Sequence, residues 1–226
     1  MPAHAAVWPA RLPARITAPA TSLWMNLAIS AMRYPEKAAL VFMGRVWTYR
    51  ELMASAEQLA GQLKALGVQA GDRVVLDMQN CPQLVITHFA ILRIDAVVVP
   101  VNPMNRAEEL KHYITDPDTR VAVTTADLAP ELAQASEAVP PEQRLKQLVV
   151  TQFTDVFDPA TVGPEDMPEA WRPWLLPVRD LPVLSSGQVH AWASLMAQPA
   201  VALPPPQAQT DDLAILPYTS GTTGLP

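Results

Sequence analysis

Apolar side chains along residues 21–151 recur either at helical spacing or in short continuous runs typical of buried strands. Leu52, Leu59 and Leu63 mark one face of a helix that ends at Gly67. The pattern predicts helices at about 23–33, 49–66, 80–93, 105–116 and 128–138, and strands at 38–43, 45–48, 73–78, 96–101, 120–124 and 147–151. Strands separated by helices of this length predict an α/β fold with a mainly parallel sheet flanked by helices.

Polar residues predict where several of these elements begin. Thr48 and Glu51 form a capping box ahead of the second helix, and Asn105 with Glu108 predicts another ahead of the fourth. Thr21 or Ser22 is the expected N-cap of the first helix. Gly44 marks the turn of a hairpin between the first two strands.

The regular pattern stops after residue 151. Residues 152–206 contain ten of the 24 prolines together with Trp171, Trp174 and Trp192. We interpret this part as a long excursion with one modest helix at about 189–196, and segments of this kind are often functional. The tryptophans either pin it to the core or form an apolar lip for a greasy substrate. The predicted organisation is an extended arm at 1–20, an α/β subdomain at 21–151, the excursion at 152–206, and a strand with a loop at 207–226 that begins a truncated second subdomain.

Composition narrows the class of protein. The chain has 226 residues, of which 50% are apolar and 17% charged, and its net charge of −6 gives no reason to expect nucleic acid as a partner. A single cysteine, Cys81, excludes an internal disulfide framework and favours a reducing compartment, so we expect a cytoplasmic protein. No apolar stretch is long enough to span a bilayer. The acid-free start resembles a transit peptide, but its prolines favour an untargeted arm.

The final stretch carries the clearest chemistry. An apolar run at 213–216 leads into a cluster in which hydroxyls alternate with glycines, which suits the wrapping of backbone N–H groups and hydroxyls around a phosphate. The spacing is not that of a Walker-type loop, and an ordinary polar turn is the alternative. The candidate phosphate-binding residues are Thr219, Ser220, Gly221, Thr222, Thr223 and Gly224.

Three ordered motifs resemble the adenylate-forming superfamily. Tyr218-Thr-Ser-Gly-Thr-Thr-Gly-Leu-Pro226 is similar to its phosphate-binding motif, and Trp47-Thr-Tyr-Arg-Glu-Leu52 resembles an early signature. Ile91-Leu-Arg-Ile-Asp-Ala-Val-Val-Val-Pro-Val-Asn-Pro103 resembles a helix-to-strand segment of the family. The stretch from Val101 to Leu110 looks most similar to bacterial long-chain fatty-acid–CoA ligases. Asp95 departs from the glycine that many relatives carry, and we expect it at the exposed end of its strand.

The resemblance implies part of the N-terminal domain of an acyl-CoA synthetase. Such an enzyme uses ATP with Mg²⁺ to convert a carboxylic acid, here a fatty acid, to an acyl-adenylate, and coenzyme A then forms the thioester. The superfamily's lysine after the loop, its adenine and Mg²⁺ motifs and its catalytic C-terminal lysine would lie beyond residue 226. We therefore expect no catalytic residue and no activity in residues 1–226 alone, with peripheral membrane contact possible and the oligomeric state open.

Two alternatives stay open at this point. The chain could be a folded, non-catalytic binding module, or its parent ligase could act on medium-chain or aryl acids.

The remaining polar candidates predict structural roles. His4, His88, His112 and His190 lack metal-ligand spacing, so no metal site is expected. Glu108 and His112 are expected to share a helix face, and Asp116-Pro-Asp118 to form a turn. Cys81 begins a helix, where a thiol pKa can fall, but a buried or capping role is the preferred interpretation.

Overall fold

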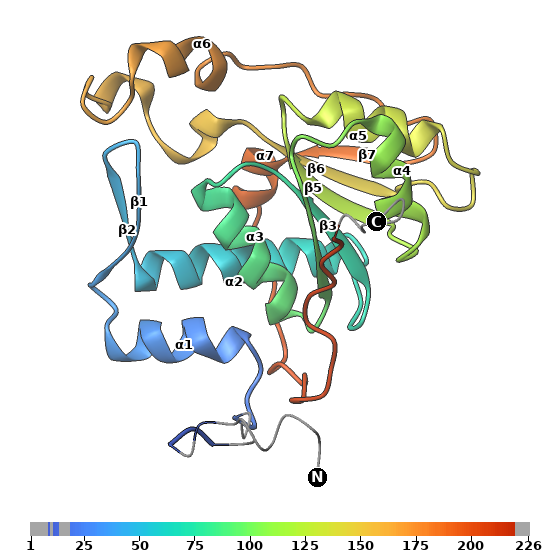
Figure 1. Cartoon of the computed structure of the whole chain (residues 1–226). Coiled ribbons are helices and arrows are strands. Elements are labelled where there is room, and N and C mark those ends of the chain that lie inside the picture. The colour runs from blue at the N-terminus through green and yellow to red at the C-terminus, as the bar shows by residue number, and fades with distance from the viewer. Residues whose placement is uncertain (1–8, 10, 14–18, 220–226) are drawn as a thin grey trace.

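A five-stranded parallel sheet lies at the centre of the computed structural model, which describes residues 9, 11–13 and 19–219. Its strands run in the order β4-β3-β5-β6-β7, and every neighbouring pair is parallel (Figure 1). This confirms the predicted α/β class. The strands are β3 (Arg73–Asp77), β4 (Val97–Val101), β5 (Val121–Thr125), β6 (Gln147–Thr151) and β7 (Gln188–Ala191).

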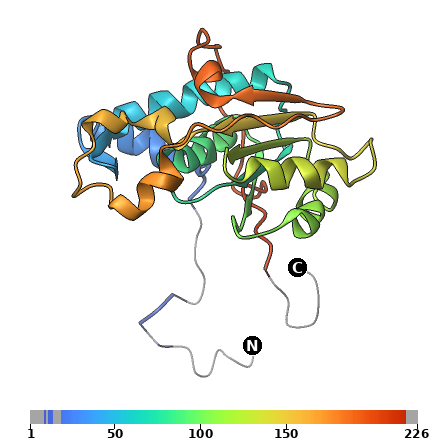
Figure 2. The same cartoon turned by 90° about the horizontal axis from the view of Figure 1, so that it is seen from above.

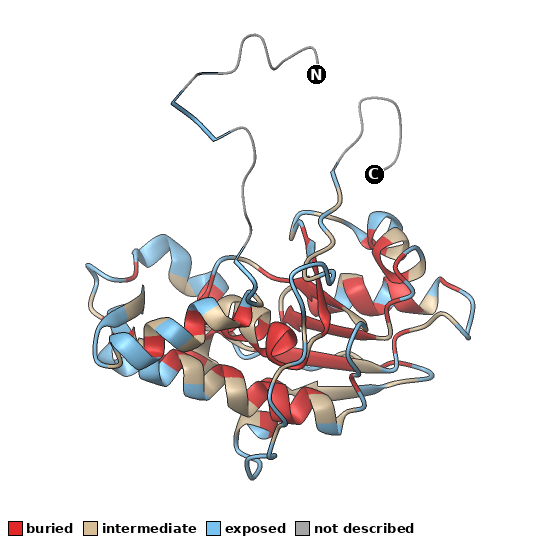
Figure 3. Cartoon of the chain, turned by 90° about the horizontal axis from the view of Figure 1, so that it is seen from below, coloured by how far each residue is buried: buried red, intermediate tan, exposed pale blue. Residues whose placement is uncertain are grey.

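Helices cover both faces of this sheet, as the view from above shows (Figure 2). One face packs against α2 (Tyr49–Ala65), α3 (Pro82–Arg93) and α7 (Trp192–Met196), and α1 (Trp24–Arg33) packs against α2 and α3. The other face packs against α4 (Ala107–Thr115) and α5 (Ala129–Glu137). Because both faces are covered, β3, β4, β5 and β6 are mostly buried, whereas the edge strand β7 is exposed or half-buried. The buried residues gather along the sheet and the inner helix surfaces (Figure 3).

Local sequence signals placed several elements correctly. The hairpin β1 (Ala38–Phe42) and β2 (Arg45–Thr48) turns at Met43 and Gly44, which both have positive φ. The Thr48–Glu51 capping box is present: the Glu51 N–H donates to Thr48 Oγ1 at 3.2 Å, and the Thr48 N–H donates to Glu51 Oε2 at 2.8 Å. Helix α2 ends at Ala65, Leu66 is its C-cap, and the C′ residue Gly67 has the left-handed φ of 99° that a glycine provides.

Two predicted caps are wrong. Leu23 occupies the N-cap position of α1 and makes no side-chain cap bond, so neither Thr21 nor Ser22 caps the helix. Helix α4 begins later than predicted because residues 102–105 form a turn, in which Asn102 accepts from the backbone of Met104 and Asn105.

The start of α4 is satisfied by other carboxylates. Glu109 Oε2 accepts from the Arg106 N–H at 2.8 Å, and Glu131 of α5 accepts from the Ala107 N–H at 2.9 Å. The capping group therefore comes one residue later than the predicted Asn105–Glu108 pair, with help from a neighbouring helix.

The excursion contributes a strand that the sequence did not predict. Residues 188–191, expected to start a helix, instead form β7 beside β6, and the helix begins at Trp192. Elsewhere this segment contains short 3-10 helices at Phe153–Val156, Pro159–Thr161 and Glu169–Trp171 and one turn of α-helix, α6 (Arg172–Leu175).

Candidate functional site

The predicted phosphate loop begins at the last residue that the structure describes. Thr219 is exposed, and Ser220, Gly221, Thr222, Thr223 and Gly224 lie outside the described residues. The part of the site whose geometry is described is therefore the segment that leads into the loop.

That segment lies along the free edge of β4. Ile215 pairs with Val98 in a parallel bridge, in which the Val98 N–H donates to Ala214 at 2.9 Å and the Leu216 N–H donates back to Val98 at 2.8 Å. The strand predicted for the run at 213–216 is thus a single bridge. Because the bridge is parallel, the chain leaves it in the direction of the strands' carboxyl ends, where ligands bind in open α/β sheets.

Tyr218 holds the chain immediately before the loop. Its ring makes edge contacts with His112, at 5.3 Å between centroids, and with Tyr113, at 5.0 Å, and its hydroxyl donates to Asp116. Burial, followed by the Asp116 carboxylate, raises the pKa of Tyr218, so the phenol stays protonated and keeps its donor role. His112 therefore packs against Tyr218 just before the loop, and the ion pair with Glu108 is made by Lys111.

A buried carboxyl lies where the chain order of the strands reverses. From β3 the chain crosses to β4 on one side and returns to β5 on the other, and Asp77 ends β3 opposite Thr124 of β5. Asp77 is 2% exposed, and its Oδ2 accepts a hydrogen bond from the Thr124 hydroxyl at 3.5 Å. Its pKa is raised to about 7, chiefly because burial disfavours the charged form; the Thr124 hydrogen bond lowers the pKa, and nearby Asp127 raises it. Sequence reasoning missed this residue, although an acid closing a buried strand was a visible signal.

The excursion covers this end of the sheet. Trp174 Nε1 donates to Asp127 at 2.9 Å, and the Trp174 ring lies 4.9 Å from Phe153. Trp192 is buried in the core, whereas Trp171 is 48% exposed. For Trp174 and Trp192 these contacts match the pinning role.

Cys81 and the histidines play structural roles. Burial raises the pKa of the Cys81 thiol to about 11 against the lowering effect of backbone hydrogen bonds, so the buried interpretation is confirmed. His190 Nε2 lies 2.7 Å from Gln147 Oε1, and His88 makes an edge contact with Phe89. Within the described part of the chain, no group of three or more His, Cys, Asp or Glu residues could hold a metal ion, and His4 lies outside that part.

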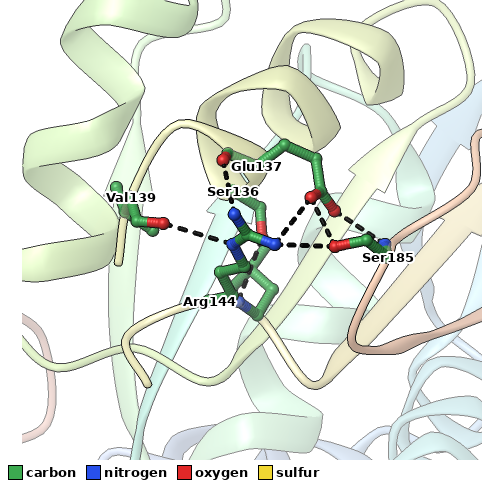
Figure 4. A network of polar contacts seen from close by, with 6 residues as sticks. Ser136, Glu137, Val139, Arg144 and Ser185 are labelled. Atoms are coloured by element: carbon green, nitrogen blue, oxygen red, sulfur yellow. Dashed lines mark hydrogen bonds and ion pairs between the residues drawn. The ribbon is translucent and has the colours of Figure 1, made fainter. Parts of the chain in front are cut away.

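A dense polar network joins α5 to the excursion (Figure 4). Arg144 donates to the carbonyls of Glu137 and Val139 and to Ser185 Oγ, while the Glu137 carboxylate accepts from the N–H and hydroxyl of Ser185. The Ser185 bonds hold the pKa of Glu137 below its usual value. The network contains a serine and an acid but no histidine or lysine base, and it fixes the loops that precede β6 and β7.

Known proteins resemble the chain along nearly its whole length. The AMP-binding enzyme family matches residues 27–226. A long-chain-fatty-acid–CoA ligase from Bacillus subtilis (strain 168) is 29% identical over 228 residues, covering 98% of this chain and 38% of the relative. The corresponding ligase from Salmonella typhimurium is 30% identical over 223 residues, covering 96% of this chain and 38% of the relative.

Solved structures give the same fold. An anthranilate CoA ligase in complex with anthranoyl-AMP has a TM-score of 0.71 at 21% identity, over 93% of this chain and 34% of that protein. The chain spans about 38% of the length of the curated relatives it matches. Among the described residues, no helix is long and apolar enough to cross a membrane.

Proposed function

The chain belongs to the AMP-binding enzyme family, and from this premise we propose that it supplies the N-terminal part of an ATP-dependent, AMP-forming acyl-CoA ligase. One observation carries the proposal. A segment docked in parallel on the edge of β4 leads directly into the hydroxyl- and glycine-rich run that begins at Thr219, within the region matched by the family.

The proposed reaction has two halves. A carboxylate oxygen attacks the α-phosphate of Mg-ATP, forming an acyl-adenylate and releasing pyrophosphate. The thiol of coenzyme A then attacks the acyl carbon, forming the thioester and releasing AMP.

The proposed role of this chain lies in the first half. The hydroxyls and N–H groups of Thr219, Ser220, Thr222 and Thr223 would hold the β- and γ-phosphates, with Gly221 and Gly224 allowing the backbone to approach closely. Such contacts neutralise the charge that develops as pyrophosphate leaves and keep the attack in line. Mg²⁺ would arrive with ATP, and no described residue is assigned as its ligand.

We propose a long-chain fatty acid as the substrate, because the long-chain ligases resemble the chain at about 30% identity. A cytoplasmic location with peripheral membrane contact belongs to the same proposal. Medium-chain and aryl acids are the competing substrate classes.

The test is thioester formation by the complete translation product that contains this sequence, supplied with ATP, Mg²⁺, coenzyme A and a panel of acids. We expect long-chain fatty acids to give the highest kcat/KM. A preference for aryl or medium-chain acids would contradict the substrate class alone. Absence of AMP and thioester formation with every acid would contradict the ligase and favour a non-catalytic binding module.

A further inference from the structure

The chain that returns from the excursion toward the loop is held by side chains of α2 and α3. Gln58 Nε2 donates to the Gln198 carbonyl at 2.7 Å, and Gln62 Nε2 donates to the Pro199 carbonyl at 3.0 Å. Farther along, the largely buried Arg93 donates through Nη1 to the Pro204 carbonyl at 2.8 Å. Residues 198–206 are rich in proline, which lacks an N–H, so these side chains supply donors that a β-ladder would otherwise provide.

Asp95 makes the next contacts along this path. It follows α3 in a Schellman arrangement: the Ala96 N–H donates to the Ile91 carbonyl at 3.1 Å, and the Asp95 N–H donates to the Leu92 carbonyl at 3.2 Å. Its φ is 58°. Helix α2 ends in the same way with Gly67, the residue that adopts this conformation without a steric penalty.

The side chain at this strained backbone position has a specific pair of partners. Asp95 Oδ2 accepts from the Gln207 N–H at 2.7 Å, and Oδ1 accepts from the Ala208 N–H at 3.1 Å. A glycine would relieve the strain but would leave both amides without these bonds. Bonds between a carboxylate and backbone N–H groups are among the stronger hydrogen bonds in proteins. The half-buried carboxylate is thus engaged with the return segment, which differs from the exposed strand end that we expected from the sequence.

These two hydrogen bonds, here called the Asp95 clamp, also help to set which residues of the return segment pair with β4 on the way to the loop. Asp95 fixes residues 207–208, and Val98, three positions along, fixes residues 214–216 through the parallel bridge. Both anchors belong to one continuous stretch, the turn after α3 and the start of β4. Downstream, Tyr218 is held by Asp116, and Thr219 follows.

We propose that Asp95 is a positioning residue for the phosphate loop: its carboxylate holds residues 207–208 so that the chain reaches β4 in one register and presents Thr219 at a fixed place. This inference rests on the proposed ligase function. Asp95 touches no substrate and acts only through the segment that it anchors.

Asp118 provides a matched control within the same chain. It has a φ of 53° after α4, and the Thr119 N–H donates to the Ile114 carbonyl at 2.9 Å, as in the turn at Asp95. Its carboxylate, however, pairs with Arg120 at 2.6 Å and with Arg73 at 4.0 Å, and neither arginine belongs to residues 207–218. Asp118→Gly therefore relieves the same kind of strain and removes a carboxylate without touching the return segment.

The experiment compares Asp95→Gly, Asp95→Ala and Asp118→Gly in the complete translation product. Hydrogen exchange of peptides covering 207–218 reports the clamp, and the KM values for ATP and for the carboxylic acid report the loop. Both Asp95 variants should accelerate exchange at Gln207 and Ala208 and raise the KM for ATP about tenfold, with the KM for the acid unchanged. Asp118→Gly should change neither quantity.

A merely structural role predicts a different pattern. Asp95→Ala keeps the strained φ whereas Asp95→Gly relieves it. If the variants act only by destabilising the fold, the loss of activity should be larger for Asp95→Ala, and both KM values should change. That pattern overturns the proposal, as does unchanged exchange at 207–208. If the wild-type protein activates no acid, both the ligase proposal and the link between Asp95 and ATP binding fail. The hydrogen-exchange data still decide whether Asp95 holds residues 207–208.

Discussion

Asp77 shows how one side chain can couple the stability of this fold to pH. Its carboxyl is almost completely buried at the end of β3, and the Thr124 hydroxyl at 3.5 Å compensates little for the lost hydration. The folded state therefore favours the protonated form, with a pKa of about 7 against an ordinary value of 3.8. The resulting stabilisation is fully present below pH 3.8 and is lost as the pH rises through about 7.

Asp77→Asn should remove this dependence because the amide carries no charge. The variant should be more stable than the wild type at pH 8, by on the order of 2–4 kcal/mol, and the difference should shrink toward pH 4. Urea unfolding at the two pH values measures it, with the exposed Asp180→Asn as a control for the loss of one negative charge. An Asp77→Asn difference that is the same at both pH values would show that the carboxyl ionises normally in the fold.

At the scale of elements, β7 depends on close contact with the loop before β6. A Cβ added to Gly187 would lie 2.6 Å from the Leu145 carbonyl oxygen and 3.0 Å from that of Lys146, both backbone atoms. The neighbouring Gln188 N–H donates to Lys146 at 2.9 Å, so the clash falls at the first contact of the strand with the sheet.

Gly187→Ala should therefore destabilise the protein by about 1–3 kcal/mol, the usual cost of overpacking. Gly163→Ala is the matched control, because the three atoms nearest the added Cβ all belong to the exposed, flexible Glu165 side chain, and its effect should stay within about 0.5 kcal/mol. Equal unfolding midpoints for the two variants would mean that β7 accommodates the added methyl group without a loss in the free energy of unfolding.

The sequence predicted the elements whose signals are local. The Thr48–Glu51 box and the hairpin turn at Gly44 depend on residues a few positions apart, and both were found. Strand β7 was not predicted, because its four residues are held in place by pairing with β6, some forty positions earlier. The cap of α4 failed for a similar reason, since part of it is supplied by Glu131 of another helix.

The same distinction applies to the candidate site. The hydroxyls and glycines of 219–224 form a continuous motif that predicts phosphate chemistry from residue types alone. The Asp95 clamp joins residues 112 positions apart, and the sequence showed only an aspartate where the resemblance to the family led us to expect glycine. The sequence shows that residue Asp77 is an acid, but only the folded sheet shows that it is buried.

At the scale of the whole molecule, the sheet edge at β4 brings together the parts of the proposed site. The excursion leaves from β6, returns through the side chains of α2 and α3, and passes Asp95 and Val98 before it reaches Thr219. The chain covers about 38% of its curated relatives, so we expect residues 1–226 to fold without catalysing adenylate formation.

The most direct test of the central claim is carboxylate-dependent exchange of labelled pyrophosphate into ATP. The complete translation product should catalyse this exchange, residues 1–226 alone should not, and Thr222→Val with Thr223→Val should reduce kcat/KM for ATP by about a hundredfold or more. Because valine preserves side-chain volume, an unchanged far-UV circular dichroism spectrum would confirm that the fold is intact. Full exchange activity in the double variant would contradict the assignment of the loop to the ATP phosphates.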